Sequence, residues 1–201
     1  MDDQAGGDIE REGKLPAGGS KSGGLDPSDA DLLAKAARGD GKAFGLLVNR
    51  HADGMFRLAA SLVGNAADAE DVVQEALAGA FRGAGKFQGR SSVKTWLTRI
   101  VLTQSAIVQR DRKRRRLRQN DSAAQNVAAA GGTAGVEMRI DLHAALQRLS
   151  SEHRQVLALR EFEHLSYADI AAALDLPVGT IESRLYRARS ELKTVLQDYR
   201  V

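Results

Sequence analysis

Apolar side chains recur every three to four positions over most of the chain, which is the spacing of one buried helix face. The first such stretch is residues 26–39, where Ser28 can cap a helix and Gly39 can end it. Three longer stretches follow, and the spacing predicts helices at about residues 42–63, 66–82 and 93–116. We expect these four helices to pack as one N-terminal helical domain.

The helical pattern stops and then resumes. Residues 119–136 carry one charge and only valine among the large apolar types, so we interpret them as a flexible linker. Residues 1–25 contain seven glycines and almost no large apolar side chains, which predicts a disordered tail. The fold class is therefore all-α: two small helical domains, residues 26–118 and 137–201, joined by a flexible linker.

Composition narrows the class of protein. The absence of cysteine excludes disulfides and thiolate zinc sites, and it fits a reducing compartment. No apolar run approaches the roughly 20 residues that span a bilayer, and the N-terminus has no apolar signal segment. We therefore expect a cytoplasmic protein without membrane insertion. No catalytic cluster, metal site or cofactor motif is found, because the four histidines are scattered: His51, His143, His153 and His164.

Residues 164–192 are the most informative stretch, reading HLSYADIAAALDLPVGTIESRLYRARSEL. Ser166 and Asp169 form an S-x-x-D capping box, which predicts a short helix ending near Leu174. The segment DLPVG predicts a tight turn, and a second helix is expected to start near Thr180. Helix, turn and helix in this order predict a helix-turn-helix in the C-terminal domain.

The second helix of this motif divides into an apolar and a polar face. Ile181, Leu185, Ala188 and Leu192 fall on one face and are expected to pack inward. On the other, Arg187 suits bidentate contact with guanine, and Glu182 could accept from a cytosine amino group. A solvated helix face in a bundle is the alternative. We predict that duplex DNA contacts Thr180, Glu182, Ser183, Arg184, Tyr186, Arg187 and Arg189.

This stretch, preceded by LQRLSSEHRQVLALREFEHL, resembles domain 4 of bacterial sigma factors, and most closely that of the extracytoplasmic-function (ECF) group. The elements P-V-G-T, S-R and R-A-R occur together and in order. The resemblance implies that the C-terminal domain reads the −35 promoter element and contacts the β flap of RNA polymerase.

An acidic stripe follows the third predicted helix on the face opposite its apolar residues. It consists of Asp68, Asp71 and Glu75, with Gln74 near its edge. Acidic outer faces are common on helices, so the pattern alone leaves an ordinary solvated surface open. The segment DAEDVVQEAL also resembles the part of sigma domain 2 that docks on the β′ clamp helices of core RNA polymerase. The resemblance implies that these four residues contact polymerase.

Residues 87–101, FQGRSSVKTWLTRIV, contain the only tryptophan of the chain. Seven basic residues against one acidic follow in residues 109–118; they can be a solvated helix end or a track for a single strand of DNA. The first segment resembles the sigma domain 2 pattern that lies over the −10 element. The resemblance implies −10 binding or melting by Phe87, Arg90, Ser91, Ser92, Lys94, Trp96, Arg99, Thr103, Arg110, Arg112, Lys113 and Arg114.

Trp96 has two interpretations. It shares an apolar stripe with Leu97 and Ile100, which favours packing in the core. The resemblance instead places its ring at the upstream fork of melted −10 DNA, and both can hold in part because a tryptophan is rarely fully buried. The chain departs from the family at Thr103, where an asparagine is usual, at Arg90 and at Glu182. These departures leave the promoter sequence open.

The resemblance implies a sigma factor that binds core RNA polymerase and directs initiation from promoters with −35 and −10 elements, on double- and single-stranded DNA. An anti-sigma factor is a possible partner. A conventional two-domain transcriptional regulator is the alternative, with the N-terminal domain as a sensor. That regulator would bind duplex DNA tightly alone and would need neither the acidic stripe nor the single-strand loop.

Overall fold

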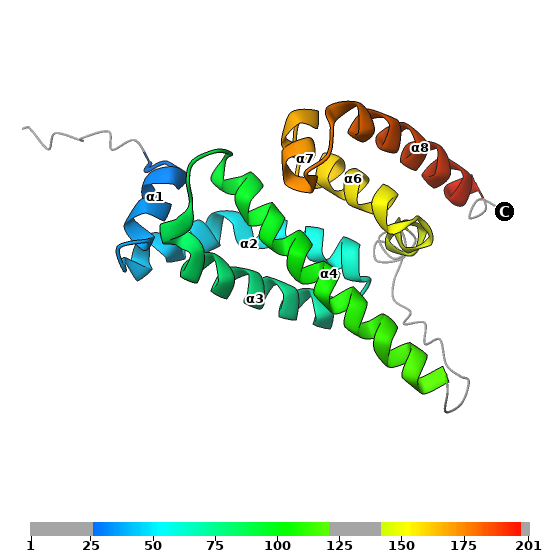
Figure 1. Cartoon of the computed structure of the whole chain (residues 1–201), viewed down its shortest axis with the longest axis horizontal. Helices are drawn as coiled ribbons and strands as arrows, with labels where there is room; N and C mark the ends of the chain where they lie inside the picture. The colour runs from blue at the N-terminus through cyan, green and yellow to red at the C-terminus, as the bar shows by residue number, and fades with distance from the viewer. Residues whose placement is uncertain (1–25, 121–141, 198–201) are drawn as a thin grey trace, which may run out of the picture.

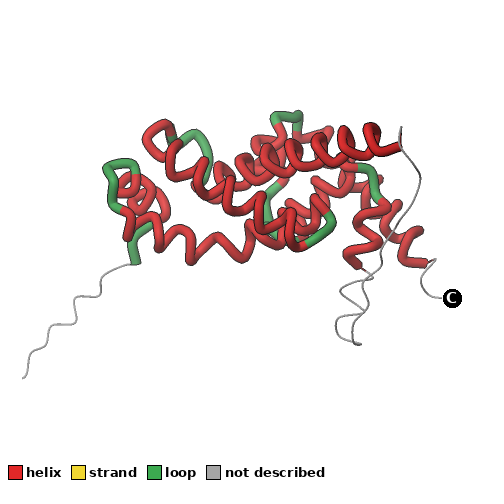
Figure 2. Tube along the Cα trace, turned by 90° about the horizontal axis from the view of Figure 1, so that it is seen from below, coloured by secondary structure: helices red, strands yellow, loops and turns green. Residues whose placement is uncertain are grey.

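The structure, a computed structural model, describes residues 26–120 and 142–197. Within these two ranges every regular element is helical, and short loops join the helices (Figures 1 and 2). The elements are α1 (Asp29–Ala36), α2 (Gly41–Val63), α3 (Ala66–Gly83), the 3-10 turn η1 (Ala84–Lys86), α4 (Val93–Asn120), α6 (Ser151–Glu161), α7 (Tyr167–Leu174) and α8 (Val178–Gln197), with residues 142–148 also helical. The all-α prediction is confirmed. The predicted tail and most of the predicted linker lie outside the described residues.

Side-chain caps start the first three helices. The Ser28 hydroxyl accepts a hydrogen bond from the Asp31 amide, as the sequence predicts for α1. The Asp40 carboxylate accepts from two amides at the start of α2, and the Asn65 side chain accepts from the Asp68 amide at the start of α3. Each cap satisfies amides that have no partner inside the helix, and replacing one with alanine costs about 1 kcal/mol.

The core of the N-terminal domain lies between α2, α3 and α4, with α1 packed against α2 (Figure 1). These helices face one another through leucine, valine and alanine side chains that are almost fully buried. Burying a leucine such as Leu58 contributes about 1.5–3 kcal/mol, and its replacement by alanine would cost roughly 2–5 kcal/mol. The central residues are Leu47, Leu58, Leu62, Val72, Ala76, Leu97 and Val101.

Helix α4 extends beyond this core. Its buried residues end at Ser105, whereas the helix continues to Asn120, two residues past the predicted domain boundary at residue 118. The part beyond the core carries the basic run, most of which is exposed. A long helix with one packed end and one charged, exposed end is what the apolar spacing and the charge run predicted.

The C-terminal domain packs α6 against α8, with α7 joined to both. Ser150 caps α6, and the buried faces of the three helices meet through Val156, Leu159, Ile170, Ile181 and Leu185.

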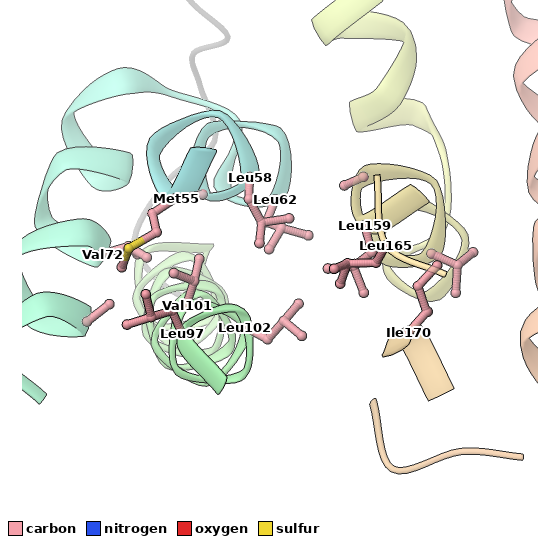
Figure 3. Close-up of a cluster of buried hydrophobic side chains, with 14 of the residues drawn as sticks. Met55, Leu58, Leu62, Val72, Leu97, Val101, Leu102, Leu159, Leu165 and Ile170 are labelled. Atoms are coloured by element: carbon pink, nitrogen blue, oxygen red, sulfur yellow. The ribbon is translucent and has the colours of Figure 1, made fainter. Parts of the chain in front are cut away.

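The two domains pack against each other. Helix α2 contacts α6 and α4 contacts α7, and one continuous cluster of buried side chains runs through both domains. Figure 3 shows Leu62 and Leu102 directed toward Leu159 and Leu165 across this boundary. The sequence predicted two tethered domains and gave no indication of this contact. No described helix has the length and apolar character needed to cross a membrane.

Candidate nucleic-acid interface

The helix-turn-helix forms where the sequence places it. The Ser166 hydroxyl accepts from the Asp169 amide at 3.1 Å and donates to the Asp169 carboxylate at 2.5 Å, which starts α7. Asp175 ends α7 in the left-handed region at φ +54°, a conformation that aspartate tolerates better than most residues. The Pro177 carbonyl then accepts from the Thr180 amide at 2.9 Å. Helix α8 therefore begins at Val178, two residues before the predicted start.

The exposed face of α8 carries the predicted base-reading residues. Ile181, Leu185 and Ala188 are fully buried, so the side chains between them are forced outward. Tyr186 is 78% exposed, so its ring does not pack in the core of the domain. Exposed with it on α8 are Glu182, Ser183, Arg187, Arg189 and Ser190.

Two of the predicted phosphate contacts are also bound within the domain. Arg184 pairs with Glu152 at 2.9 Å, and Arg189 pairs with Glu161 at 3.0 Å. The hydrogen bond to the Glu161 carboxylate raises the pKa of Arg189 above its usual range, so this guanidinium stays charged. Arg184 thus links α8 to the start of α6, and Arg189 links it to the end of α6.

Residues 87–92 form the loop before α4, and its side chains divide into two groups. Arg90 and Gln88 are exposed, and Gly89 has φ +67°, which favours glycine. Ser92, in contrast, caps α4: its hydroxyl accepts from the Thr95 amide at 3.0 Å and lies 2.8 Å from the Thr95 hydroxyl. Ser92 thus has a structural role that the sequence prediction did not assign to it.

The Trp96 ring is partly buried and partly exposed. Its centroid lies 5.4 Å from that of Phe87 at a tilt of 57°, and a Cβ at Gly83 would lie 3.5 Å from Trp96 Cζ2. The residue packs against the core, contacts Phe87 at the start of the 87–92 loop and remains partly exposed. The structure is compatible with both interpretations of this residue at once.

The basic part of α4 includes one arginine that the domain holds. Arg112 donates to the Val63 carbonyl at 2.7 Å and lies 3.2 Å from the Asp68 carboxylate, so it caps the end of α2. Arg114 lies 3.8 Å from Asp111, a loose pair on the same helix. Arg110 and Lys113 are exposed on the same stretch. Arg110, Arg112, Lys113 and Arg114 together form a basic track on the part of α4 beyond the core, and Arg112 is the member that is bound within the domain.

The acidic stripe on α3 is split in the same way. Asp71, Gln74 and Glu75 are exposed opposite the buried Val72 and Ala76, as predicted. Asp68 instead accepts from the Asn65 side chain at 2.9 Å and pairs with Arg112. Asp71, Gln74 and Glu75 therefore remain accessible to a partner. Asp68, at the N-terminal end of the stripe, is bound within the domain.

Two predicted −10 residues contact the C-terminal domain. Lys94 donates to the Glu163 carbonyl at 2.6 Å and lies 3.3 Å from the Glu163 carboxylate. Arg99 donates to the Ala172 carbonyl, and Thr95, beside them on α4, donates to Asp169 at 3.4 Å. Thr103 is exposed one turn further along, where its hydroxyl donates to the Arg99 carbonyl. Sequence reasoning did not find Glu163, because a single glutamate after a helix carries no signal of a distant partner.

Two family matches cover most of the described chain. Residues 47–117 match Sigma-70 region 2, and residues 139–192 match Sigma-70, region 4. The first match covers most of α2, all of α3, the 87–92 loop and most of α4, and the second covers α6, α7 and most of α8.

Curated relatives match along nearly their full length. The RNA polymerase sigma-H factor of Pseudomonas aeruginosa is 35% identical over 184 residues, covering 84% of this chain and 94% of the relative. The ECF RNA polymerase sigma factor SigM of Mycobacterium tuberculosis is 38% identical over 170 residues, covering 84% of this chain and 85% of the relative. The ECF RNA polymerase sigma-E factor of Escherichia coli is 32% identical over 182 residues, covering 85% and 95%.

Solved structures agree in fold. The sigma factor RpoE of Bartonella quintana, solved with the anti-sigma factor NepR, has a TM-score of 0.68 at 29% identity, covering 78% of this chain and 98% of the other. CnrH, solved with the cytosolic domain of CnrY, has a TM-score of 0.67 at 27% identity, covering 85% and 97%. Because both sigma-70 regions are present in order and the relatives match over most of their length, this chain belongs to the sigma-70 family, in its extracytoplasmic-function group.

Proposed function

We propose that this sigma factor recognises promoters with two surfaces, one on each domain, and leaves catalysis to the polymerase that it binds. As a sigma factor it binds core RNA polymerase and directs promoter-specific initiation. The main observation that supports DNA recognition is the polar face of α8, which is exposed opposite the fully buried Ile181, Leu185 and Ala188. A helix fixed on one side and free on the other is the form in which a helix-turn-helix enters the major groove.

On α8, the base contacts come from exposed side chains and the phosphate contacts from paired ones. Arg187 donates two hydrogen bonds to one guanine, and Glu182 accepts from a cytosine amino group. Arg184 and Arg189 are paired with Glu152 and Glu161 of α6, but each guanidinium has further N–H donors. Both arginines can therefore contact DNA phosphates without breaking these ion pairs. Thr180, Ser183 and Tyr186 complete the −35 surface.

On the N-terminal domain, the 87–92 loop and α4 hold the opened −10 element. Arg90 and Ser91 line the loop, and the exposed part of Trp96 stacks at the edge of the melted region, which offsets part of the few kcal/mol that unstacking a base costs. Thr103 faces the same strand. The backbone then follows the basic track, whose members are Arg110, Arg112, Lys113 and Arg114.

Polymerase docks on a separate face. Asp71, Gln74 and Glu75 point away from the core of the N-terminal domain and suit a basic surface of the β′ clamp helices. Asp68 lies at one end of this stripe. The C-terminal domain meets the β flap, and the protein acts in the cytoplasm, where the transcribing polymerase is.

We also propose that a protein partner binds this sigma factor and inhibits it. RpoE of Bartonella quintana was solved with an anti-sigma factor, and its fold matches this one with a TM-score of 0.68. We expect an anti-sigma factor to compete with polymerase for this chain.

The test is transcription in vitro with core RNA polymerase on a promoter library, with and without the protein. We expect new start sites that share a −35 and a −10 sequence. An Arg187→Ala variant should lose starts according to their −35 sequence, whereas Asp53→Asn, at an exposed position on α2, should lose none. Tight binding to duplex DNA with no new start site would overturn the proposal in favour of a conventional regulator.

A further inference from the structure

A basic pocket of about 560 Å³ lies where the end of α2, the middle of α4 and the start of α6 meet. Three cations line it, Arg112, Lys113 and Arg154, together with the amide side chains of Gln109 and Gln147. Among the described residues, those that line the pocket include no aspartate or glutamate. The proposed function gives Arg154 and the two glutamines no role, so this concentration of positive charge needs another explanation.

Arg154 is a partly buried cation without an acidic partner among the described residues. Its guanidinium donates to the Leu62 carbonyl at 3.0 Å, to the Leu149 carbonyl at 3.2 Å and to the Gln147 side-chain oxygen, and all three acceptors are uncharged. Its Nε is enclosed and has no hydrogen-bond partner in the described part of the chain. Burial lowers the pKa of Arg154 from its usual value. Buried charges are normally paired, so Arg154 lacks the counter-ion that its burial calls for.

The remaining charges around the pocket do not supply that counter-ion. Arg112 is already neutralised, because it lies 3.2 Å from the Asp68 carboxylate. Lys113 is exposed and adds a second unpaired cation. The carboxyl end of α2 carries roughly half a negative charge, which leaves the pocket with a net charge of roughly plus one and a half.

Hydrogen-bond donors outnumber acceptors in the pocket. Arg112 uses one nitrogen for the Val63 carbonyl and for Asp68, and its guanidinium has further N–H donors. Gln109 donates to the Leu62 carbonyl at 2.8 Å with one of its amide hydrogens and retains the other. The Lys113 ammonium adds donors of its own. A ligand for this pocket is therefore an anion with several acceptor oxygens.

Both domains contribute to the pocket. Gln147 of the C-terminal domain donates to the Ser61 carbonyl at 2.9 Å, close to the end of α2. Gly64 permits this approach, because a Cβ there would lie 2.9 Å from the Gln147 side chain. The pocket is complete only when the two domains are packed, so an anion bound in it stabilises the folded protein by mass action.

We propose that the basic pocket binds one phosphate group, either free or as the monoester of a small molecule. A phosphate group carries about 1.5–2 negative charges at neutral pH and offers three strong acceptor oxygens, which matches both the net charge and the free donors of the pocket. Lys113 and Arg154 supply the uncompensated charge, and Arg112 and Gln109 supply further donors. A DNA strand is the alternative ligand, but a strand fits an extended groove, whereas three helices enclose this pocket. The inference does not depend on how the protein recognises its promoter.

The test is isothermal titration of the full chain with inorganic phosphate and, separately, with glycerol 3-phosphate, at an ionic strength held constant with sodium chloride. Lys113→Gln and Arg154→Gln each remove one cation of the pocket. Lys42→Gln and Arg57→Gln are the matched controls, since both side chains are exposed on α2 and lie outside the pocket. Thermal unfolding with and without each ligand is measured on the same proteins.

We expect the wild type and both controls to bind at one site and to unfold at a higher temperature when phosphate is present. Lys113→Gln should bind about three- to tenfold more weakly, because one charge-assisted contact is lost. Arg154→Gln should bind about tenfold more weakly or worse, and it should also unfold at a lower temperature without ligand. The exposed Lys113 keeps the test decisive should Arg154→Gln fail to fold. Tighter binding of glycerol 3-phosphate would identify an ester as the ligand, and equal binding would identify free phosphate.

Three results would overturn the inference. The first is wild-type protein that binds neither ligand at millimolar concentration, and the second is equal affinity of Lys113→Gln and Lys42→Gln, which would indicate attraction by net charge alone. The third is a Lys113→Gln variant that binds a single-stranded oligonucleotide more weakly but both small ligands normally, because the pocket would then belong to the DNA surface. Failure of the proposed function is a separate result, since it would show as missing start sites with core polymerase whatever the titrations report.

Discussion

Arg112 lies 3.2 Å from Asp68, so a residue predicted to follow the DNA backbone and a residue predicted to bind polymerase neutralise each other inside one domain. Arg112 also donates to the Val63 carbonyl, and Asp68 accepts from Asn65 at the start of α3. The pair joins the end of α2, the start of α3 and the middle of α4.

We therefore predict that Asp68→Asn acts on stability first. It should lower the free energy of unfolding by about 1 kcal/mol, because it weakens both the start of α3 and a partly exposed ion pair. Asp71→Asn, on the free part of the stripe, should leave unfolding unchanged and weaken binding to core polymerase. Urea unfolding and anisotropy with labelled protein separate the two effects. Equal stability of both variants would contradict the structural role of Asp68.

Arg187 is expected to be the main base contact of α8. Arg187→Ala should weaken binding to a −35 duplex by about 1–3 kcal/mol, or roughly 5- to 150-fold, with no change in melting temperature, because the side chain is exposed. Arg187→Lys should not restore affinity, since an ammonium lacks the fork that binds one guanine twice. Gel shifts on the mapped promoter and its −35 variants measure this. A uniform loss on all sequences would instead identify a phosphate contact.

For Trp96, packing and DNA melting are separable. Trp96→Phe should keep most of the contact with Phe87 and Gly83, yet reduce open-complex formation several-fold on duplex promoters. On a template with a pre-melted −10 bubble the same variant should regain activity, since the melting step is bypassed. Trp96→Ala should in addition lose stability. Permanganate footprinting with thermal unfolding reports both quantities, and an unaltered footprint for Trp96→Phe would leave the ring a packing role alone.

Acid is expected to loosen α1. Burial disfavours the charged form of Asp29, but hydrogen bonds from Arg50 and His51 and the attraction of both outweigh it and lower the pKa of Asp29 below its usual 3.8. A carboxylate with a lowered pKa adds stability above its unfolded pKa and loses it as the pH falls through the folded value. The contribution should be constant from pH 7 to about 5 and decline below about 4. Urea unfolding at several pH values tests this, and Asp29→Asn should remove that part of the decline.

Local patterns predicted the elements of this fold well, and one boundary shows their limit. The S-x-x-D box gave the start of α7, and the spacing of Ile181, Leu185 and Ala188 gave the buried face of α8. The start of α8 was placed two residues late, because the whole DLPVG segment was assigned to the turn. In the structure the Pro177 carbonyl accepts the first bonds, and a proline carbonyl gives no distinctive pattern in sequence.

Pairings between distant residues account for what the sequence did not show. Ser92, Arg112 and Asp68 were chosen for external partners, and each has a partner inside the domain. Lys94 and Arg99 contact residues of the C-terminal domain, although the composition of residues 119–136 predicts a flexible linker and two domains that do not touch. Such contacts depend on how helices are placed in space, and no periodicity along one helix carries that information.

Helix α4 is continuous from the 87–92 loop to the end of the basic track, so the distance between the loop and the track is fixed. At 1.5 Å per residue, the 18 positions from Trp96 to Arg114 span roughly 27 Å, the rise of about eight base pairs of duplex. Each residue also turns the helix by 100°, so distance and angular phase along the DNA are set together. One residue inserted between Thr103 and Arg110 would move the track by only about 1.5 Å along the helix. It would also rotate the cations of the track by about 100° about the helix axis, away from the face that Trp96 shares with them in the proposed function. In the proposed function, the length of this single helix therefore sets the spacing between the opened bases and the first phosphates that the basic track binds.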